Sequence, residues 1–360
     1  MPISAVDTIT LAFQHSKRQL IQPFRFWQWT RLAVVGLLAG EMGSGGFSAP
    51  NFNVPVNSRS PRQLLGDGLG AIDPAVLGGL IAVLVLAALV FVIVMMYVSS
   101  VMRFILFDSV LAKECHIRKG WTRRQPAGWR YFLWQLGFML ATLAGMVVLL
   151  GIPAAFAFAM GWFTAPHDHV LGLVLGGIVV FFLVVLFFVA IAVIHVLTKD
   201  FVVPQMALEG INAFEGWRRL LPRLKSEKGG YAGYLGLKVV MAIGAAVVVG
   251  IVATIVILVM LIPVGGFGAV VVLAGKSAGS QWNLYTITLA VVVCCILLAA
   301  IFYVIALVSV PAIVFFPAYS IYFFASRYPA LDTLLYPAPP IPPQMPLTPP
   351  PLPPEPQPIG

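Results

Sequence analysis

Long apolar runs constrain the fold of this chain more than any other feature. The clearest is VLGLVLGGIVVFFLVVLFFVAIAVI, residues 170–194, which contains no charged side chain. A helix needs about 20 apolar residues to cross a hydrocarbon core roughly 30 Å thick. Backbone polar groups inside a bilayer must bond within their own segment, and a single continuous run can do so only as a helix. The run therefore predicts a membrane-spanning helix.

Five further runs have the same character. The run at 29–47 differs from the others because its apolar density ends at Gly40. The other four are residues 76–98, 132–152, 234–262 and 287–316. Of all residues, 60% are hydrophobic and 10% are charged, whereas roughly a quarter are charged in ordinary soluble domains. We therefore predict an all-α, polytopic membrane protein with about six transmembrane helices.

Positive charges predict how the chain is threaded. Of the 22 Lys and Arg residues, 19 lie in alternate connections: before or at the first span, between spans two and three, between spans four and five, and after the sixth. Such charges mark cytoplasmic loops, because lysine and arginine resist translocation. Both termini are thus expected in the cytoplasm. Residues 1–24 lack a secretory signal pattern, which favours a retained N-terminus and a bacterial inner membrane.

The amphipathic segments between spans suggest a threefold repeat. Residues 5–24, 107–121 and 205–224 each combine apolar residues at helical spacing with cations, which is typical of helices lying in a membrane interface. Pro222 is expected to bend or end the third helix. Ordinary cytoplasmic helices packed on their neighbours remain an alternative. Each segment precedes a pair of spans, so we expect three units, at about 5–106, 107–199 and 200–326.

The chain is also expected to divide into two regions. Residues 1–336 form the membrane domain. Residues 337–360 contain 13 prolines, which leave few backbone donors and predict an extended tail in the cytoplasm.

Aromatic and basic residues beside the spans are the candidate interface. Tryptophan favours headgroup depth, and arginine favours lipid phosphates. The net charge of +9 is therefore attributed to attraction for anionic headgroups, with no nucleic-acid partner expected. A membrane-protein partner or a homo-oligomer is also consistent with this surface. The predicted interface residues are Trp121, Arg123, Arg124, Trp217, Arg218, Arg219 and Arg223.

Reactive groups are sparse in the predicted spans. Lys238 and His195 lie near cytoplasmic ends and are expected to extend toward the interface. Arg103 with Asp108, and Lys199 with Asp200, are expected to form local ion pairs. The HDH motif at 167–169 rarely suffices for a metal, and no acid, base and nucleophile converge at one depth. We therefore expect no enzyme activity, no cofactor and no metal.

Two short patterns resemble a known family. The DFVVP turn at 200–204 and the WRRLL segment at 217–221, followed by GGYAGYL, are similar to uncharacterised prokaryotic six-span proteins. These group with the glycerophosphoryl diester phosphodiesterase membrane domain and related domains of unknown function. The resemblance implies a membrane domain without catalytic residues, and this chain has no room for a soluble phosphodiesterase barrel.

Two functions fit these features. The first is a non-enzymatic membrane protein that organises lipids or partner proteins at the cytoplasmic face. The alternative is a transporter or permease subunit for an apolar or amphipathic solute, which would suit an apolar interior.

Overall fold

The computed structural model describes residues 4–22, 24–41, 74–163, 167–277 and 284–336. Secondary structure within them is helical, with no strand, which confirms the all-α expectation for this part of the chain. The elements are α1 (Asp7–Leu20), α2 (Phe26–Leu38), α4 (Pro74–Ala112), α5 (Ile117–Ala159), α6 (Val170–Leu197), the π-helical turn η1 (Thr198–Val202), α7 (Val203–Glu209), α8 (Ala213–Ser226), α9 (Lys228–Ser277), α10 (Leu284–Ala325) and α11 (Pro329–Leu335).

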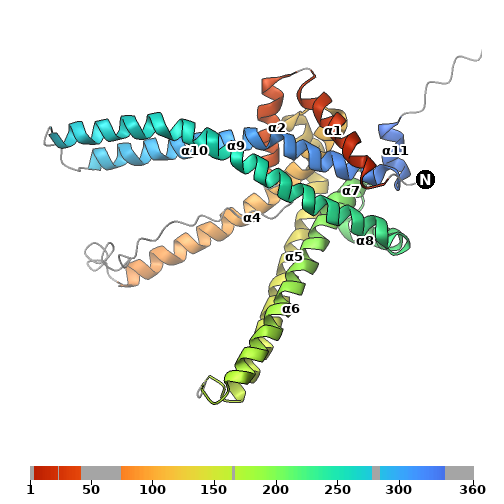
Figure 1. Cartoon of the computed structure of the whole chain (residues 1–360), viewed down its shortest axis with the longest axis horizontal. Coiled ribbons are helices and arrows are strands. Elements are labelled where there is room, and N and C mark those ends of the chain that lie inside the picture. Colours follow the sequence, from red (N-terminus) through yellow and green to blue (C-terminus); the bar gives the residue numbers. More distant parts are fainter. Residues whose placement is uncertain (1–3, 23, 42–73, 164–166, 278–283, 337–360) are drawn as a thin grey trace, which may run out of the picture.

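Three long arms extend in different directions from a common centre (Figure 1). One arm is α4, the second is the α5–α6 hairpin, and the third is the α9–α10 hairpin. We call the centre the hub. It consists of α1, α2, η1, α7, α8 and α11, together with the inner ends of the long helices.

The arms have the surface of membrane-embedded helices. Most of the side chains described on their outer parts are apolar and exposed, with Leu171 of α6 73% exposed. Contiguous apolar surface of this size is rare in contact with water. Among the described residues, five segments are long and apolar enough to cross a membrane, as expected of a multi-pass membrane protein. They are Val76–Ala112, Ile117–Ala159, Val170–Glu209, Lys228–Ile262 and Val291–Ala325.

The first of the six predicted spans is not among these five. Helix α2 has 13 residues, about 20 Å of helix, which is shorter than a hydrocarbon core. Leu32, Ala33 and Val35 are fully buried in the hub rather than facing lipid. At Gly36 the helix lies so close to α10 that a Cβ would be 2.6 Å from side-chain carbons of Ile313. Residues 42–73 lie outside the described residues, so a count of six stays a prediction.

The predicted interfacial helices are only partly found. Helix α1 forms within residues 5–24. Residues 107–121 form no helix of their own, because they are divided between the end of α4, a turn at 113–116 and the start of α5. Residues 205–224 are interrupted at Gly210, whose left-handed backbone (φ +68°) ends α7. Pro222 does not end α8, which continues to Ser226.

An aromatic cluster joins η1 to the third arm inside the hub. The ring of Phe201 lies 5.2 Å from that of Tyr231 and 5.1 Å from those of Tyr234 and Phe324. Tyr234 also stacks on Tyr319 of α10, at 4.9 Å. Each such ring pair stabilises the fold by about 0.5–1.5 kcal/mol in addition to the free energy gained by burying its apolar surface. This cluster therefore fixes η1 against α9 and α10.

Candidate functional site

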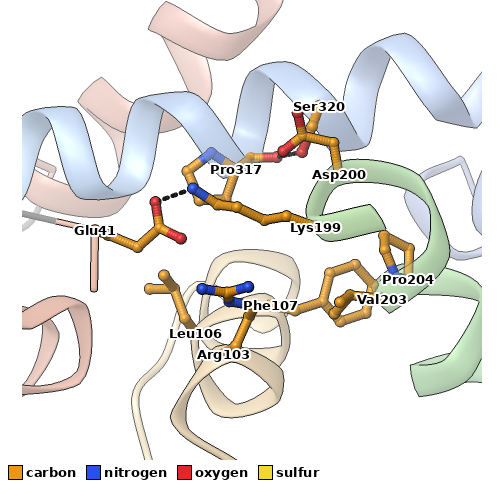
Figure 2. Close-up of a pocket in the computed structure, with 10 residues that line it drawn as sticks. All are labelled: Glu41, Arg103, Leu106, Phe107, Lys199, Asp200, Val203, Pro204, Pro317 and Ser320. Carbon is orange, nitrogen blue, oxygen red and sulfur yellow. Dashed lines mark hydrogen bonds and ion pairs between the residues drawn. The ribbon is translucent and has the colours of Figure 1, made fainter. Parts of the chain in front are cut away.

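Five charged side chains are buried together in the hub. Arg103 comes from α4, Lys199 and Asp200 come from η1, Lys238 comes from α9, and Glu41 follows α2. Each is at most 8% exposed. Four of them surround a small cavity between the inner ends of the helices (Figure 2). We call these five residues the charge cluster.

Ion pairs in the charge cluster connect different elements. Lys199 Nζ pairs with Glu41, and Lys238 Nζ pairs with Asp200. The Tyr234 hydroxyl also donates to Asp200 Oδ2, at 2.9 Å. The prediction of a local Lys199–Asp200 pair was wrong, because consecutive residues of a helical turn point in different directions. Lys238 does not extend to the interface as predicted, since it is only 4% exposed.

The expected pair of Arg103 with Asp108 is also absent. Residues five apart on a helix point about 140° away from each other, so these two side chains face different neighbours. Arg103 donates to the Tyr131 hydroxyl and to the Ala39 carbonyl, the latter at 3.2 Å. Asp108 instead accepts two hydrogen bonds from Arg124, at 2.5 and 2.6 Å.

The cavity at the charge cluster has a volume of about 30 Å³, room for about one or two water molecules. Glu41 Oε1 and Arg103 Nε have no hydrogen-bond partner among the described residues. Burial alone would raise the pKa of Glu41, but the nearby Lys199 and Arg103 cations outweigh it and hold the pKa below its ordinary value. Glu41 therefore stays ionised, and the arrangement is suited to holding helices together.

Helix α1 completes the hub by capping α4. The last carbonyls of a helix have no partner within it. His15 Nε2 lies 2.9 Å from the Val110 carbonyl oxygen, and Gln19 Nε2 donates to the Ser109 carbonyl at 2.9 Å. The Tyr322 hydroxyl of α10 lies 3.1 Å from His15 Nδ1. The polar side of α1 is thus turned inward, onto the end of α4.

Several predicted interface residues of α8 are engaged within the protein. The Trp217 indole N–H donates to the Thr198 hydroxyl at 3.0 Å, so this ring packs on the hub. Arg219 pairs with Glu209 and Glu215. The guanidinium of Arg223 lies 5.2 Å from the Tyr328 ring and 5.9 Å from the Phe324 ring. Arg218 is more exposed than these three: its side chain is 85% exposed, and its one ion pair among the described residues is a long one to Glu215, at 3.9 Å.

The predicted interface residues of the second unit are divided in the same way. Trp121 is half-buried, with its ring edge-on to Tyr97 at 6.2 Å. Arg124 is buried and also donates to the Ala207 carbonyl at 2.5 Å. Arg123 is exposed. Of the seven predicted residues, Arg123 and Arg218 are the two that project away from the hub.

The sequence predicts amphipathic helices in residues 5–24 and 205–224, but it does not show which of their side chains lie on the outside of the hub. Helix α8 buries Ala213, Gly216 and Leu220, and it exposes Phe214 (78%) on the same face as Arg218. Helix α1 likewise exposes Phe13, with Lys17 also exposed one turn later. The shared signal is an aromatic residue followed four positions later by a cation. We refer to these two surfaces as the outer faces.

Comparisons with known proteins place the chain in a family without adding a function. Among the described residues, no group of three or more His, Cys, Asp or Glu side chains could hold a metal ion. No curated protein and no solved structure matches the chain, and the resemblance to phosphodiesterase membrane domains finds no support there. The model of a family of unknown function, DUF7544, matches residues 3–334, nearly the whole chain, and the protein therefore belongs to that family.

Proposed function

We propose that the protein is a non-enzymatic membrane protein that organises anionic lipids at the cytoplasmic face of the membrane. The observation that carries the proposal is the composition of the outer faces of α1 and α8. There, large apolar side chains and unburied cations lie together on helices that are fixed to the inner ends of membrane-spanning segments.

The outer face of α8 has the spacing of an interfacial helix. Phe214, Arg218, Leu221 and Lys225 follow one another at steps of four, three and four, which places them on one side of the helix. All four are exposed. Moving an exposed Phe or Leu into the headgroup region gains up to about 1.5–3 kcal/mol each, and each cation near an anionic surface adds about 1 kcal/mol.

The outer face of α1 supports the same placement. Val6, Phe13 and Ile21 are exposed, and Lys17 lies between the last two. The opposite side of α1 is occupied by its contacts with α4 and α10. A soluble helix would place its large apolar residues on that packed side, so the inverted arrangement favours contact with lipid.

The charge cluster supports a scaffolding role. Its pairs connect the segment after α2 with η1, and η1 with α9, while Arg103 connects α4 to Tyr131 of α5. All three arms are thereby joined beneath the outer faces. We propose that this connection lets the hub hold lipids, or a partner protein or second copy, in a fixed relation to the arms. Cytoplasmic termini and a bacterial inner membrane belong to the same proposal.

Lipid enrichment around reconstituted protein tests the proposal. Energy transfer from tryptophan to dansyl-labelled phosphatidylglycerol, relative to dansyl-labelled phosphatidylcholine, measures the enrichment of the anionic lipid. Arg218→Gln should lower this enrichment about fivefold at low salt, because one surface cation is worth about 1 kcal/mol. Lys228→Gln, a control that removes one exposed cation outside the outer faces, should leave it unchanged. Equal enrichment for wild type and Arg218→Gln would reject the proposal.

A transport function is the second candidate, because ionisable groups buried near spans commonly mark solute pathways. The charge cluster is such a group, but its cavity of about 30 Å³ has no room for an amphipathic solute in this conformation. Flux of labelled fatty acids or lysolipids into proteoliposomes would support transport. Flux equal to that of protein-free vesicles would reject transport of these solutes.

A further inference from the structure

A second cavity lies on the outside of the hub. It is a groove of about 160 Å³ between the start of α2 and the turn at 113–116 that joins α4 to α5. The side chains that matter for its chemistry are Arg25, Trp27, Gln28, Arg31, Glu114 and His116. The groove is about five times larger than the cavity at the charge cluster and is open to the surroundings.

The groove has an excess of available positive charge. Arg25 is exposed, and its guanidinium makes no hydrogen bond or ion pair with the described residues. Arg31 makes one long contact, from Nη1 to the Cys115 carbonyl at 3.4 Å. Glu114 is the single carboxylate among the described residues of the lining. Two guanidinium groups and one carboxylate leave one net positive charge in the groove. A bound monoanion would neutralise it.

Hydrogen bonds from α2 to its neighbours hold the backbone that forms the wall of the groove. Gln28 Nε2 donates to the Lys113 carbonyl at 2.7 Å, which ties α2 to the turn. The Trp29 indole N–H donates to the Leu20 carbonyl at 2.9 Å, which ties α2 to α1. These bonds hold the backbone that carries Arg25 and Arg31. An anion would therefore bind to a backbone that is already ordered, so little free energy would be lost in ordering the site.

One exposed tryptophan lines the groove, and two exposed phenylalanines lie close to it in the sequence. Trp27 is 74% exposed, and its neighbours Phe24 and Phe26 are exposed as well. Exposed Trp and Phe beside cations are typical of the membrane interface, where a ring can contact acyl chains while cations contact phosphates. The groove thus offers charge for a phosphate and, next to it, apolar surface for hydrocarbon.

We propose that this groove binds the headgroup phosphate of an anionic phospholipid, with the acyl chains lying against Phe24, Phe26 and Trp27. Arg25 and Arg31 donate charge-assisted hydrogen bonds to the phosphate oxygens, for which the planar guanidinium is well suited. The inference rests on the proposed attachment of the hub to anionic lipid, and it adds a defined binding site to that diffuse attraction.

Native mass spectrometry of the full chain in mild detergent tests the site, with phosphatidylglycerol as the added lipid. Arg25→Gln should weaken binding of the first lipid about tenfold, since one charge-assisted hydrogen bond is lost. Arg25 has no partner among the described residues, so this variant should keep its fold. Lys228→Gln should bind as the wild type does. Trp27→Ala should weaken lipid binding several-fold and leave inorganic phosphate binding unchanged.

Three results would overturn the inference. The first is unchanged phosphatidylglycerol binding by Arg25→Gln, or a loss of lipid affinity in Lys228→Gln equal to that in Arg25→Gln. The second is equally tight binding of phosphatidylcholine. The third is inorganic phosphate that binds as tightly as the lipid, which would identify a free-phosphate site. The lipid-enrichment experiment with Arg218→Gln reports separately on the outer face of α8. A failure of the groove with a positive result there would leave the proposed function standing.

Discussion

Removing the ammonium group of Lys238 should destabilise the protein strongly. Lys238 and Asp200 are at most 4% exposed, so water cannot replace either partner. Removing one member of a buried pair typically costs about 3–5 kcal/mol, because an unpaired charge remains. Asp200 keeps its hydrogen bond from Tyr234 at 2.9 Å, which favours the lower end of that range. Lys238→Met should therefore lower the free energy of unfolding by about 3 kcal/mol, roughly 150-fold in the folding equilibrium.

A double-mutant cycle in detergent measures the interaction itself. Denaturant unfolding, followed by loss of helical circular dichroism, would be measured for Lys238→Met, Asp200→Asn and the double variant. The single variants each leave a buried group without its partner, whereas the double variant leaves no net charge. The double variant should therefore be more stable than the sum of the two losses predicts, by about 2 kcal/mol. A loss below about 1 kcal/mol for Lys238→Met, together with additive effects, would refute the buried pair.

Three further perturbations test other parts of the hub. Gly36→Ala should lower the free energy of unfolding by about 1–3 kcal/mol, because the added methyl group overpacks against Ile313, and Ile313→Val should restore part of that loss. Gly137→Ala is the control, because nothing lies within 4 Å of a Cβ there. Equal thermal stability of the two alanine variants would be contrary evidence. Burial, with smaller effects of Lys113 and Arg18, lowers the pKa of His15 below 6.5. The unfolded chain then binds more protons, so stability should fall as pH drops below about 6.5, and His15→Gln should remove this part of the pH dependence in thermal unfolding; an identical pH profile would count against it. Gln19→Leu should cost about 1–3 kcal/mol by leaving the Ser109 carbonyl without its donor, and unaltered unfolding would show that the cap is dispensable.

The arms are the part of the fold that the sequence predicts well. The apolar run at 170–194 lies within α6 (Val170–Leu197), and its length alone identifies a span. A helix that crosses hydrocarbon must be continuous and apolar, so one uninterrupted stretch of the sequence is enough to identify it. The run at 29–47 shows the limit of this argument. A short apolar helix suits a protein interior as well as a membrane, and α2 is buried by α4 and α10 rather than by lipid.

The charge cluster could not be predicted from local patterns. Glu41 and Lys199 are separated by 158 positions, and nothing in either neighbourhood indicates the other. The interface residues illustrate the same difficulty at short range. Arg123 and Arg124 are adjacent and chemically identical, yet one is exposed and the other is bound to Asp108. Tertiary packing sets the rotation of the helix, and this rotation decides which arginine is exposed to lipid or to a partner. The amino-acid composition of the segment does not predict it.

The proposal that the outer faces lie in the membrane interface is tested most directly by the depth of residue 214. A nitroxide label at Phe214→Cys would be placed in a chain whose native cysteines are replaced by alanine, and it would be compared in nanodiscs with a label at Ser226→Cys at the exposed end of the same helix. Oxygen, which concentrates in lipid, should relax the label at 214 more than a water-soluble nickel chelate does, and the reverse should hold at 226. A label at 214 that is as accessible to the chelate as the label at 226 would contradict the proposal.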